Sequence, residues 1–189
     1  MIKVYYVSEK KLPQLPENVA CIGFFDGVHL GHQALINRTV AEAKALNVEP
    51  FLITFYPDPA DIISSSKITH INSFERRVEL FEHFGIKGVI VIEFNKEVMS
   101  LSKMHFVNIY LKKLNLKGLV CGFDFHYGYR GEGNYNTLKD ELKNICPVYE
   151  VEEVTLDNEK VSSTRIKKEL QNKNYEYADL LLGYHYEHQ

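Results

Sequence analysis

The stretch Gly23-Phe24-Phe25-Asp26-Gly27-Val28-His29-Leu30-Gly31-His32 indicates the fold of this chain. An apolar run at 19–22 precedes it, and the apolar residues that follow recur every three or four positions up to about Leu46. These patterns predict a buried strand, a turn rich in glycine, and an amphipathic helix that begins near His32.

The same turn is suited to polyphosphate. Gly23, Gly27 and Gly31 let the backbone come close to a ligand, and the start of a helix presents free amides and a partial positive charge. His29 and His32 can both donate hydrogen bonds to phosphoryl oxygens. The alternative is that one histidine caps the helix and the other lies on the surface. A strand, a glycine turn, two histidines and a helix together favour the binding site.

The rest of the chain alternates strands with helices. We expect strands at 2–7 (an edge strand), 48–55, 88–94, 118–122 and 146–151. Helices are expected at 74–84, 102–114, 136–143 and 175–182. A hairpin is expected at 154–161, centred on Asp157-Asn158. The connection at 56–71 reads as irregular, and Asn72 with Glu75 reads as the cap of the helix that follows. Such alternation predicts an α/β fold with a doubly wound parallel sheet, whose ligands collect beyond the carboxyl ends of the strands.

Composition excludes several classes of protein. With 189 residues, 45% hydrophobic and 25% charged, the chain fits one globular domain, and its net charge of -3 gives no bulk attraction to nucleic acid or membranes. Its three cysteines lack the spacing of a zinc or redox site, and no apolar run approaches the ~20 residues of a membrane span. We therefore expect a cytoplasmic protein with reduced, buried thiols and no nucleic-acid or membrane partner.

Two later segments also suggest ligand contacts. Ser162-Ser163-Thr164-Arg165-Ile166 places three hydroxyls and a guanidinium at a helix start. An N-cap would explain the hydroxyls, but an arginine in the first turn opposes the helix dipole unless an anion lies there. The segment 122–134 holds four glycines among four aromatic residues, so it reads as a ligand-facing loop at the end of a strand.

Three of these segments carry a family resemblance. The block 23–32 resembles the H-x-G-H signature of nucleotidyltransferases and, in its longer form G-F-F-D-G-V-H-x-G-H, the FAD synthetase branch. The segments 162–166 and 122–128 resemble the S-S-T-R-I and G-x-D-F-x-F-G motifs of the same family. The resemblance covers about 17–183. It implies a Rossmann-like α/β/α fold of HUP type and an FMN adenylyltransferase, which transfers AMP from ATP to FMN and releases FAD and pyrophosphate, usually with Mg²⁺.

The resemblance also implies roles for individual residues. His29, His32 and Arg165 would be catalytic, contacting the phosphates of ATP and the reacting phosphoryl group. The residues implied for ATP are Gly23, Phe24, Asp26, Gly27, Gly31, Ser162, Ser163 and Thr164, and those for FMN are Phe25, Asp124, Phe125, Tyr127 and Asn134. A phosphate nucleophile needs no strong base at neutral pH, so we assign no covalent nucleophile and no general base. We name no residue as a metal ligand.

The chain departs from the family pattern at two places. Many members carry F-E-P-H-P where this chain has F-Y-P-D-P at 55–59, and Asp58 reads equally as a magnesium-organising carboxylate or a turn residue. Bifunctional members continue into a riboflavin kinase domain of β-barrel type where this chain ends. We expect one domain at 1–183 with a tail at 184–189, either as a stand-alone enzyme or as a piece cut at the domain border. We also expect no kinase activity, with FMN supplied by a separate riboflavin kinase.

Two other functions remain open at this point. One is adenylyl or cytidylyl transfer to a different phosphorylated acceptor with the same histidines. The other is a non-catalytic flavin or nucleotide sensor, which would bind its ligand without turnover.

Overall fold

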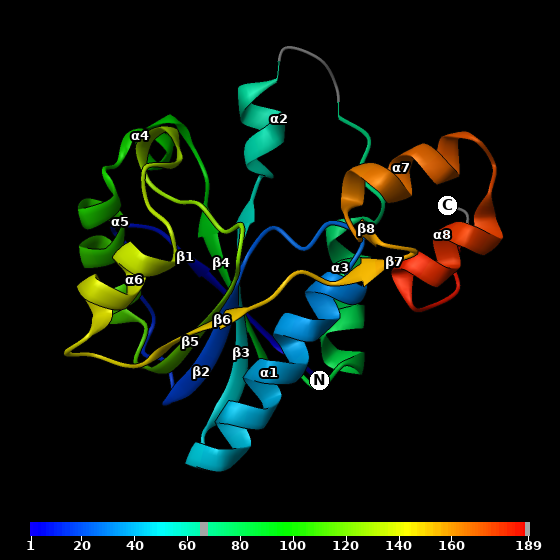
Figure 1. Cartoon of the computed structure of the whole chain (residues 1–189). Coiled ribbons are helices and arrows are strands. Elements are labelled where there is room, and N and C mark those ends of the chain that lie inside the picture. The colour runs from blue at the N-terminus through cyan, green and yellow to red at the C-terminus, as the bar shows by residue number, and fades with distance from the viewer. Residues whose placement is uncertain (65–67, 188–189) are drawn as a thin grey trace.

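The computed structural model describes residues 1–64 and 68–187. Its centre is a six-stranded sheet in the order β1-β4-β3-β2-β5-β6, in which every neighbouring pair is parallel (Figure 1). The strands are β1 Lys3–Val7, β2 Asn18–Ile22, β3 Glu49–Tyr56, β4 Gly88–Glu93, β5 Leu116–Gly122 and β6 Val148–Val151. The predicted parallel α/β sheet is confirmed, and β1 is the edge strand that the sequence indicates.

Helices cover both faces of this sheet (Figure 1). The helices are α1 Leu30–Leu46, α2 Pro59–Ile63, α3 Phe74–His83, α4 Lys96–Ser100, α5 Lys103–Ile109, α6 Tyr135–Leu142, α7 Ser163–Gln171 and α8 Tyr175–Leu182, with 3₁₀ turns η1 Leu111–Lys113 and η2 Tyr129–Gly131. One face packs against α1 and α3, and the other packs against α4, α5 and α6. This arrangement is the doubly wound fold.

The chain direction across the sheet reverses at β2. From β2 the chain runs through β3 and β4 toward one edge, and then it returns to β5 and β6 on the other side. Cys21 of β2 lies beside Val120 of β5, so the carboxyl ends of these two strands are neighbours. The glycine turn leaves β2 and the loop 122–134 leaves β5. A ligand site at the reversal point would therefore contact both.

The apolar runs of the central strands explain the core. Alternate residues of β4 point to opposite faces, so Val89 and Val91 join the cluster under α1 and α3 while Ile90 and Ile92 join the cluster under α5 and α6. At the start of β4 the ring of Phe51 lies against Gly88, where a Cβ would be 2.5 Å from the ring. Glycine is needed there because the neighbouring strand brings an aromatic ring onto its backbone.

The helix predicted at 102–114 is present but divided into two parts. The α-helix ends at Ile109, Tyr110 departs from helical geometry, and η1 follows. Leu111 and Leu114 are both fully buried. The break therefore changes the backbone without exposing either leucine.

Three shorter expectations also need correction. The connection 56–71 is not wholly irregular, because Asp58 accepts a hydrogen bond from the Ala60 amide (3.0 Å) and Pro59 starts the single turn α2. The cap of α3 is Ser73 rather than Asn72. The helix α4 was not expected, although Asn95 caps it by accepting from the Val98 amide. Residues 65–67 of this connection and His188, with the end of the tail, lie outside the described residues.

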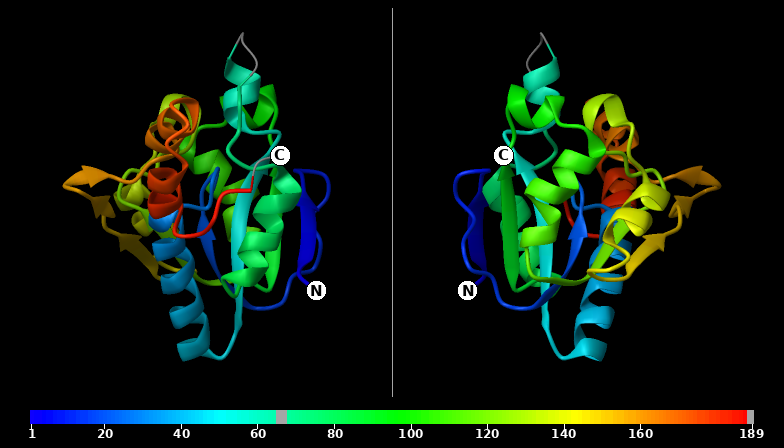
Figure 2. Two further views of the ribbon diagram at one scale, coloured as in Figure 1. Left: turned by 90° about the vertical axis from the view of Figure 1, so that its right-hand side faces the viewer. Right: turned by 90° about the vertical axis from the view of Figure 1, so that its left-hand side faces the viewer.

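The hairpin is confirmed and lies at the periphery. Its strands are β7 Thr155–Leu156 and β8 Glu159–Lys160, which pair only with each other, and Asp157 and Asn158 both have positive φ angles (54° and 62°) as a two-residue turn requires. Figure 2 shows that this hairpin projects from the side of the molecule, while α2 projects from one end.

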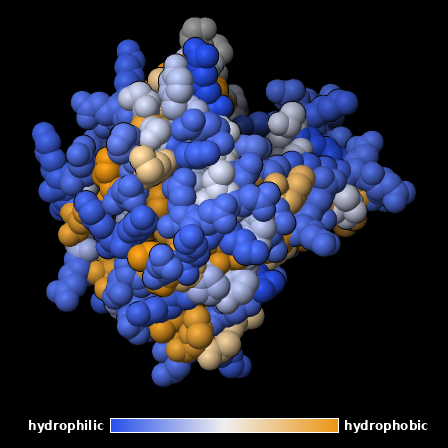
Figure 3. Space-filling view, turned by 60° about the vertical axis from the view of Figure 1, so that its left-hand side comes forward, coloured by the Kyte–Doolittle hydropathy of each residue, from blue (hydrophilic) through white to orange (hydrophobic). Residues whose placement is uncertain are grey.

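The surface and the cysteines agree with the composition. The face in Figure 3 is hydrophilic over most of its area, with hydrophobic side chains in separate small patches. All three cysteines are free and buried, and burial raises the pKa of the Cys21 and Cys121 thiols to about 12. Within the described residues, each helix is too short or too polar to cross a lipid bilayer.

Candidate functional site

The glycine turn joins β2 to α1 through an unusual backbone path. Phe25, Gly27 and Val28 have positive φ angles of 59°, 86° and 40°. A positive φ is rare for a β-branched residue, so the fold around Val28 must hold the turn in place. A Cβ on Gly27 would also lie 2.8 Å from the side chain of Ile71, so both the angle and the space require glycine.

Side chains from four other parts of the fold hold the carbonyls of this turn. These donors come from α3, from α7, from the segment after α8, and from α1 itself. The pairs are Arg77 Nη1 with Phe24 O (3.0 Å), Ser163 Oγ with Asp26 O (2.7 Å), Tyr184 Oη with Gly27 O (2.7 Å) and Gln33 Nε2 with Val28 O (2.8 Å). The turn is therefore fixed by residues distant in sequence before any ligand arrives.

The two histidines lie stacked at the start of α1. Their ring centroids are 3.7 Å apart and their planes differ by 14°. His29 is the N-cap, and its Nδ1 accepts a hydrogen bond from the His32 amide at 3.4 Å. We assign the proton of neutral His29 to Nε2 on this basis, which leaves Nε2 as a donor. A Cβ on Gly31 would lie 3.2 Å from the His29 ring, so glycine gives the ring its room.

Burial keeps both imidazoles neutral. It lowers the pKa of His29 from 6.5 to about 4, although the nearby Asp26 carboxylate opposes this shift. Burial also lowers the pKa of His32 well below its ordinary value, and the charges of His29 and Arg77 act in the same direction. Within the described residues, Nδ1 of His32 has no hydrogen-bond partner. An anion bound beside these rings would raise both pKa values and favour their protonation.

Two adjoining cavities open beside the histidines. The first, of about 230 Å³, lies between α1, the end of β5 and the hairpin, and the second, of about 400 Å³, lies along the glycine turn. The residues that line both are His32, Leu35, Gly122, Asp124 and Ser163. The cavities thus meet at the carboxyl ends of β2 and β5, where the reversal of the sheet predicts a ligand.

The first cavity has mixed walls. Apolar side chains such as Leu35, Phe123 and Val151 line it together with the carboxylates of Asp124, Glu152 and Glu153. His29, Gly31, Ser162 and Ser163 line it, as the sequence predicts for a phosphate site. Lys160 lines it as well, and its ammonium forms an ion pair with Asp124 across the cavity. Ser162 caps α7 by accepting from the Arg165 amide (3.2 Å), so its hydroxyl serves the helix in this structure.

Thr164 and Arg165 lie away from both cavities. Neither residue is part of the lining, and Thr164 is exposed. The Arg165 guanidinium is directed toward the hairpin, where Nη1 donates to the carbonyls of Leu156 and Glu159 at 3.0 Å each. Its expected contact with the triphosphate therefore stays a prediction, and this structure does not bring it together with the histidines.

The second cavity has aromatic walls. Gly23, Phe24, Phe25, Asp26 and Phe125 line it, and Phe24 is 42% exposed. Phe25 is fully buried, so the exposed ring in this wall is that of Phe24. An exposed aromatic ring in a concave site suits a flat ring system.

Three other expected contacts lie elsewhere. Gly27 is outside the lining of both cavities. Tyr127 is buried in the core with its hydroxyl 2.9 Å from Thr137 Oγ1, and Asn134 caps α6. The roles expected of these residues toward ATP and FMN stay predictions.

Three basic residues near the site were not selected from the sequence. They are Lys160 in the first cavity, Lys167 with Nζ 2.7 Å from Asp26 Oδ2, and Arg77 behind the glycine turn. Arg77 is 4% exposed. In the sequence it lies three residues after Phe74 and four before Phe81, on the same apolar face of the helix. A charged residue on that face is the sequence feature that could have identified it. Nothing local marks Lys160, which precedes the helix start by three residues.

The carboxylates and imidazoles that the structure describes in this region do not form a metal site. Among residues 1–64 and 68–187, no group of three or more His, Cys, Asp or Glu side chains is placed to hold a metal ion. Asp58 acts as the cap of α2, which fits the turn interpretation, and its Oδ2 lies 3.8 Å from Nδ1 of His70.

Relatives of this chain share its sequence over most of its length. The bifunctional riboflavin kinase/FMN adenylyltransferase of Bacillus subtilis (strain 168) is 36% identical over 174 residues, covering 90% of this chain and 54% of that protein. The protein of the same name from Listeria monocytogenes is 34% identical over 170 residues, covering 89% and 54%. The chain therefore spans about half the length of these curated relatives.

Solved structures agree on the fold. A crystal structure described as a macrolide-efflux protein from Streptococcus pneumoniae matches with a TM-score of 0.88 and 26% identity, over 97% of this chain and 60% of that one. A pantoate-beta-alanine ligase from Francisella tularensis matches with a TM-score of 0.54 at 12% identity, which shows the fold alone. The family model described as FAD synthetase matches residues 11–165. The chain belongs to the FAD synthetase family.

Proposed function

We propose that this chain is an FMN adenylyltransferase. An oxygen of the FMN phosphate would attack the α-phosphorus of ATP in line, forming the new O–P bond as the bond to pyrophosphate breaks. The observation that carries this proposal is the stacked, neutral pair His29 and His32 at the start of α1, beside two adjoining cavities, of which one reaches Lys160 and the other has the exposed ring of Phe24 in its wall. The first cavity suits a triphosphate, and the second suits an isoalloxazine ring.

Each part of the site has a role in this reaction. The free amides at the start of α1 and Nε2–H of His29 would donate to phosphoryl oxygens, and His32 would stabilise charge on the reacting phosphoryl group. The ammonium of Lys160 would leave its ion pair with Asp124 and bind phosphate oxygens instead. Phe125 would contact the flavin ring. Phe24, which the resemblance implies for ATP, lines the same cavity, and we propose that it contacts the flavin instead. Since the attacking group is already an anion, positioning and charge neutralisation supply the catalysis, with no general base.

Magnesium would enter with the nucleotide. Mg²⁺ commonly takes one or two protein carboxylates together with phosphate oxygens. Asp124, on the wall of both cavities, would be free to serve once Lys160 contacts the phosphates, whereas Asp26 is paired with Lys167. When bound, the ion would neutralise charge on the phosphates.

The test supplies ATP and Mg²⁺ with FMN, phosphopantetheine or nicotinamide mononucleotide in parallel, and measures pyrophosphate release. We expect release with FMN alone, accompanied by FAD. Release with another acceptor would assign a different transfer reaction. Tight binding of FMN and ATP without release would identify a sensor.

A further inference from the structure

The guanidinium of Arg165 is fully engaged by the hairpin and α8. Besides the two hairpin carbonyls, its Nη2 donates to the hydroxyl of Tyr177 at 2.5 Å, and its Nε lies 3.5 Å from Glu159 Oε2. The side chain is 13% exposed. A planar fork of five donors can serve several acceptors at once, which an ammonium cannot do.

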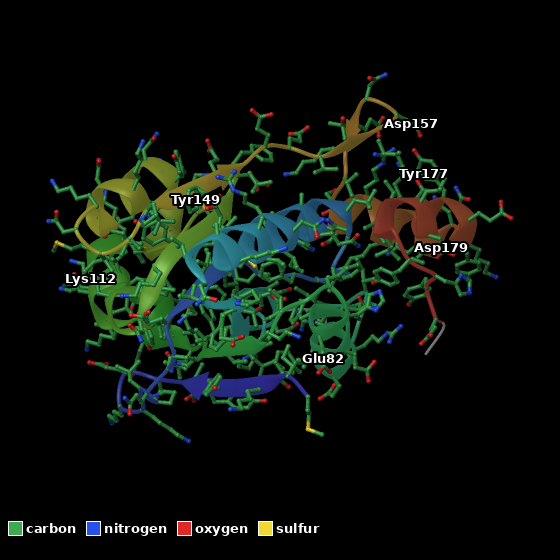
Figure 4. All side chains as sticks on the ribbon, turned by 90° about the horizontal axis from the view of Figure 1, so that it is seen from below. Glu82, Lys112, Tyr149, Asp157, Tyr177 and Asp179 are labelled. Carbon is green, nitrogen blue, oxygen red and sulfur yellow. The ribbon has the colours of Figure 1, made fainter. Side chains whose placement is uncertain are left out.

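Tyr177 extends this contact to the hairpin turn. Its hydroxyl donates to Asp157 Oδ2 at 2.5 Å, and this hydrogen bond raises the pKa of the phenol. Figure 4 shows Asp157 and Tyr177 close together where the hairpin meets α8. Arg165, Tyr177 and Asp157 therefore form one chain of hydrogen bonds, which we call the hairpin clamp.

The hairpin depends on this clamp for its position. Its two strands have two residues each and pair only with each other, so it has no ladder to the main sheet. An isolated two-stranded hairpin is marginally stable. Besides the clamp, Val154 and Leu156 pack against the small cluster around Ile166 and Leu181. At the end of the hairpin, Lys160 pairs with Asp124 and lies over the ring of Phe123.

The hairpin leads directly into the first cavity. Lys160 is the last residue of β8, and Val161, Ser162 and Ser163 follow it along the cavity wall. The carbonyl of Lys160 is itself 3.5 Å from Arg165 Nη1. A shift of the hairpin would therefore move the Lys160 ammonium relative to the histidines.

We propose that Arg165, Tyr177 and Asp157 are positioning residues that hold Lys160 in the cavity, so that Arg165 acts on the triphosphate through the hairpin and not by contact. This inference deepens the proposed function, because it assumes that the cavity binds polyphosphate. It also replaces the direct role that the sequence suggested for Arg165. Tyr177 and Asp157 enter the function only by this route.

The experiment measures the affinity for inorganic tripolyphosphate by calorimetry, which does not require FMN turnover. The variants are Tyr177→Phe, Lys160→Met and their combination, with Tyr6→Phe on the exposed face of β1 as the matched control. A hydrogen bond to a charged group supports about a tenfold effect. We expect Tyr177→Phe to weaken binding about three- to tenfold in the wild type and to have no further effect in Lys160→Met, because both changes remove the same contact.

Arg165 variants separate the two routes. On the clamp model Arg165→Lys is no better than Arg165→Met, since one ammonium cannot serve the hairpin carbonyls and Tyr177 together. Direct contact between Arg165 and the tripolyphosphate predicts a different pattern. Arg165→Lys would then keep part of the affinity for tripolyphosphate. In the Lys160→Met background, Arg165→Met would weaken binding further. Unchanged or tighter binding in Tyr177→Phe would also overturn the clamp, as would a loss additive with Lys160→Met.

The kinetic readout distinguishes failure of the clamp from failure of the proposed reaction. If FMN is the acceptor, Tyr177→Phe should raise the KM for ATP with a smaller change in kcat, while the KM for FMN stays unchanged. The binding pattern without any FAD formation would refute the acceptor and support the clamp. FAD formation without the binding pattern would refute the clamp and support the acceptor.

Discussion

Acid should destabilise this protein through His29. The side chain is 6% exposed and its pKa is lowered to about 4 by burial. Between pH 6.5 and 4 the unfolded chain binds a proton at this residue that the folded chain does not bind. The free energy of unfolding therefore decreases as the pH falls through this window, and the contribution of His29 becomes constant below it. At about 1.4 kcal/mol per pH unit, lowering the pKa from 6.5 to about 4 corresponds to about 3 kcal/mol.

The variant His29→Asn isolates this contribution, because asparagine can still cap α1 but does not titrate. Urea unfolding followed by far-ultraviolet circular dichroism at pH 7 and pH 4 gives the free energy of unfolding of each protein. From pH 7 to pH 4 we expect the wild type to lose about 3 kcal/mol more than His29→Asn. The control His83→Asn removes an exposed histidine and should follow the wild type to within about 1 kcal/mol. Equal acid losses in the wild type and in His29→Asn would show that the imidazole is accessible to protons in the fold, which would refute the assignment.

Three further predictions follow from single contacts. His32→Ala should lower kcat for FAD formation by about 10²–10³, the effect of removing one donor to developing charge; chromatography of FAD would measure it, and an unchanged rate would contradict the site. Gly88→Ala places a Cβ 2.5 Å from the Phe51 ring and should cost about 1–3 kcal/mol by overpacking, measured by urea unfolding, with the KM for ATP unchanged. Asn134→Ala removes the cap of α6 and should cost about 1 kcal/mol; an accompanying rise in the KM for FMN would support the expected flavin contact, and an unchanged KM would limit this residue to capping.

The parts of the fold that the sequence predicts are those set by local patterns. Continuous apolar runs identified the central strands because parallel strands are covered on both faces. Asp157-Asn158 identified the hairpin because both positions tolerate positive φ. The break in the helix near Tyr110 was missed because Val107, Tyr110, Leu111 and Leu114 have the apolar spacing of a continuous amphipathic helix.

In the candidate site too, local sequence predicts some side-chain positions, while contacts between distant segments determine others. The histidine pair was predictable because His29, Gly31 and His32 lie within one turn of chain, where spacing determines geometry. The direction of the Arg165 side chain was not predictable from the sequence. Its partner Tyr177 is 12 residues away, and Asp157 is 20 residues from Tyr177. A first-turn arginine beside three hydroxyls suggests an anion when only the helix is considered. Once α8 and the hairpin are in place, carbonyl oxygens and a phenol satisfy the same donors, and the charge that reaches the cavity is that of Lys160. A local motif can thus identify which segment serves the ligand while the contact itself passes to a neighbouring residue.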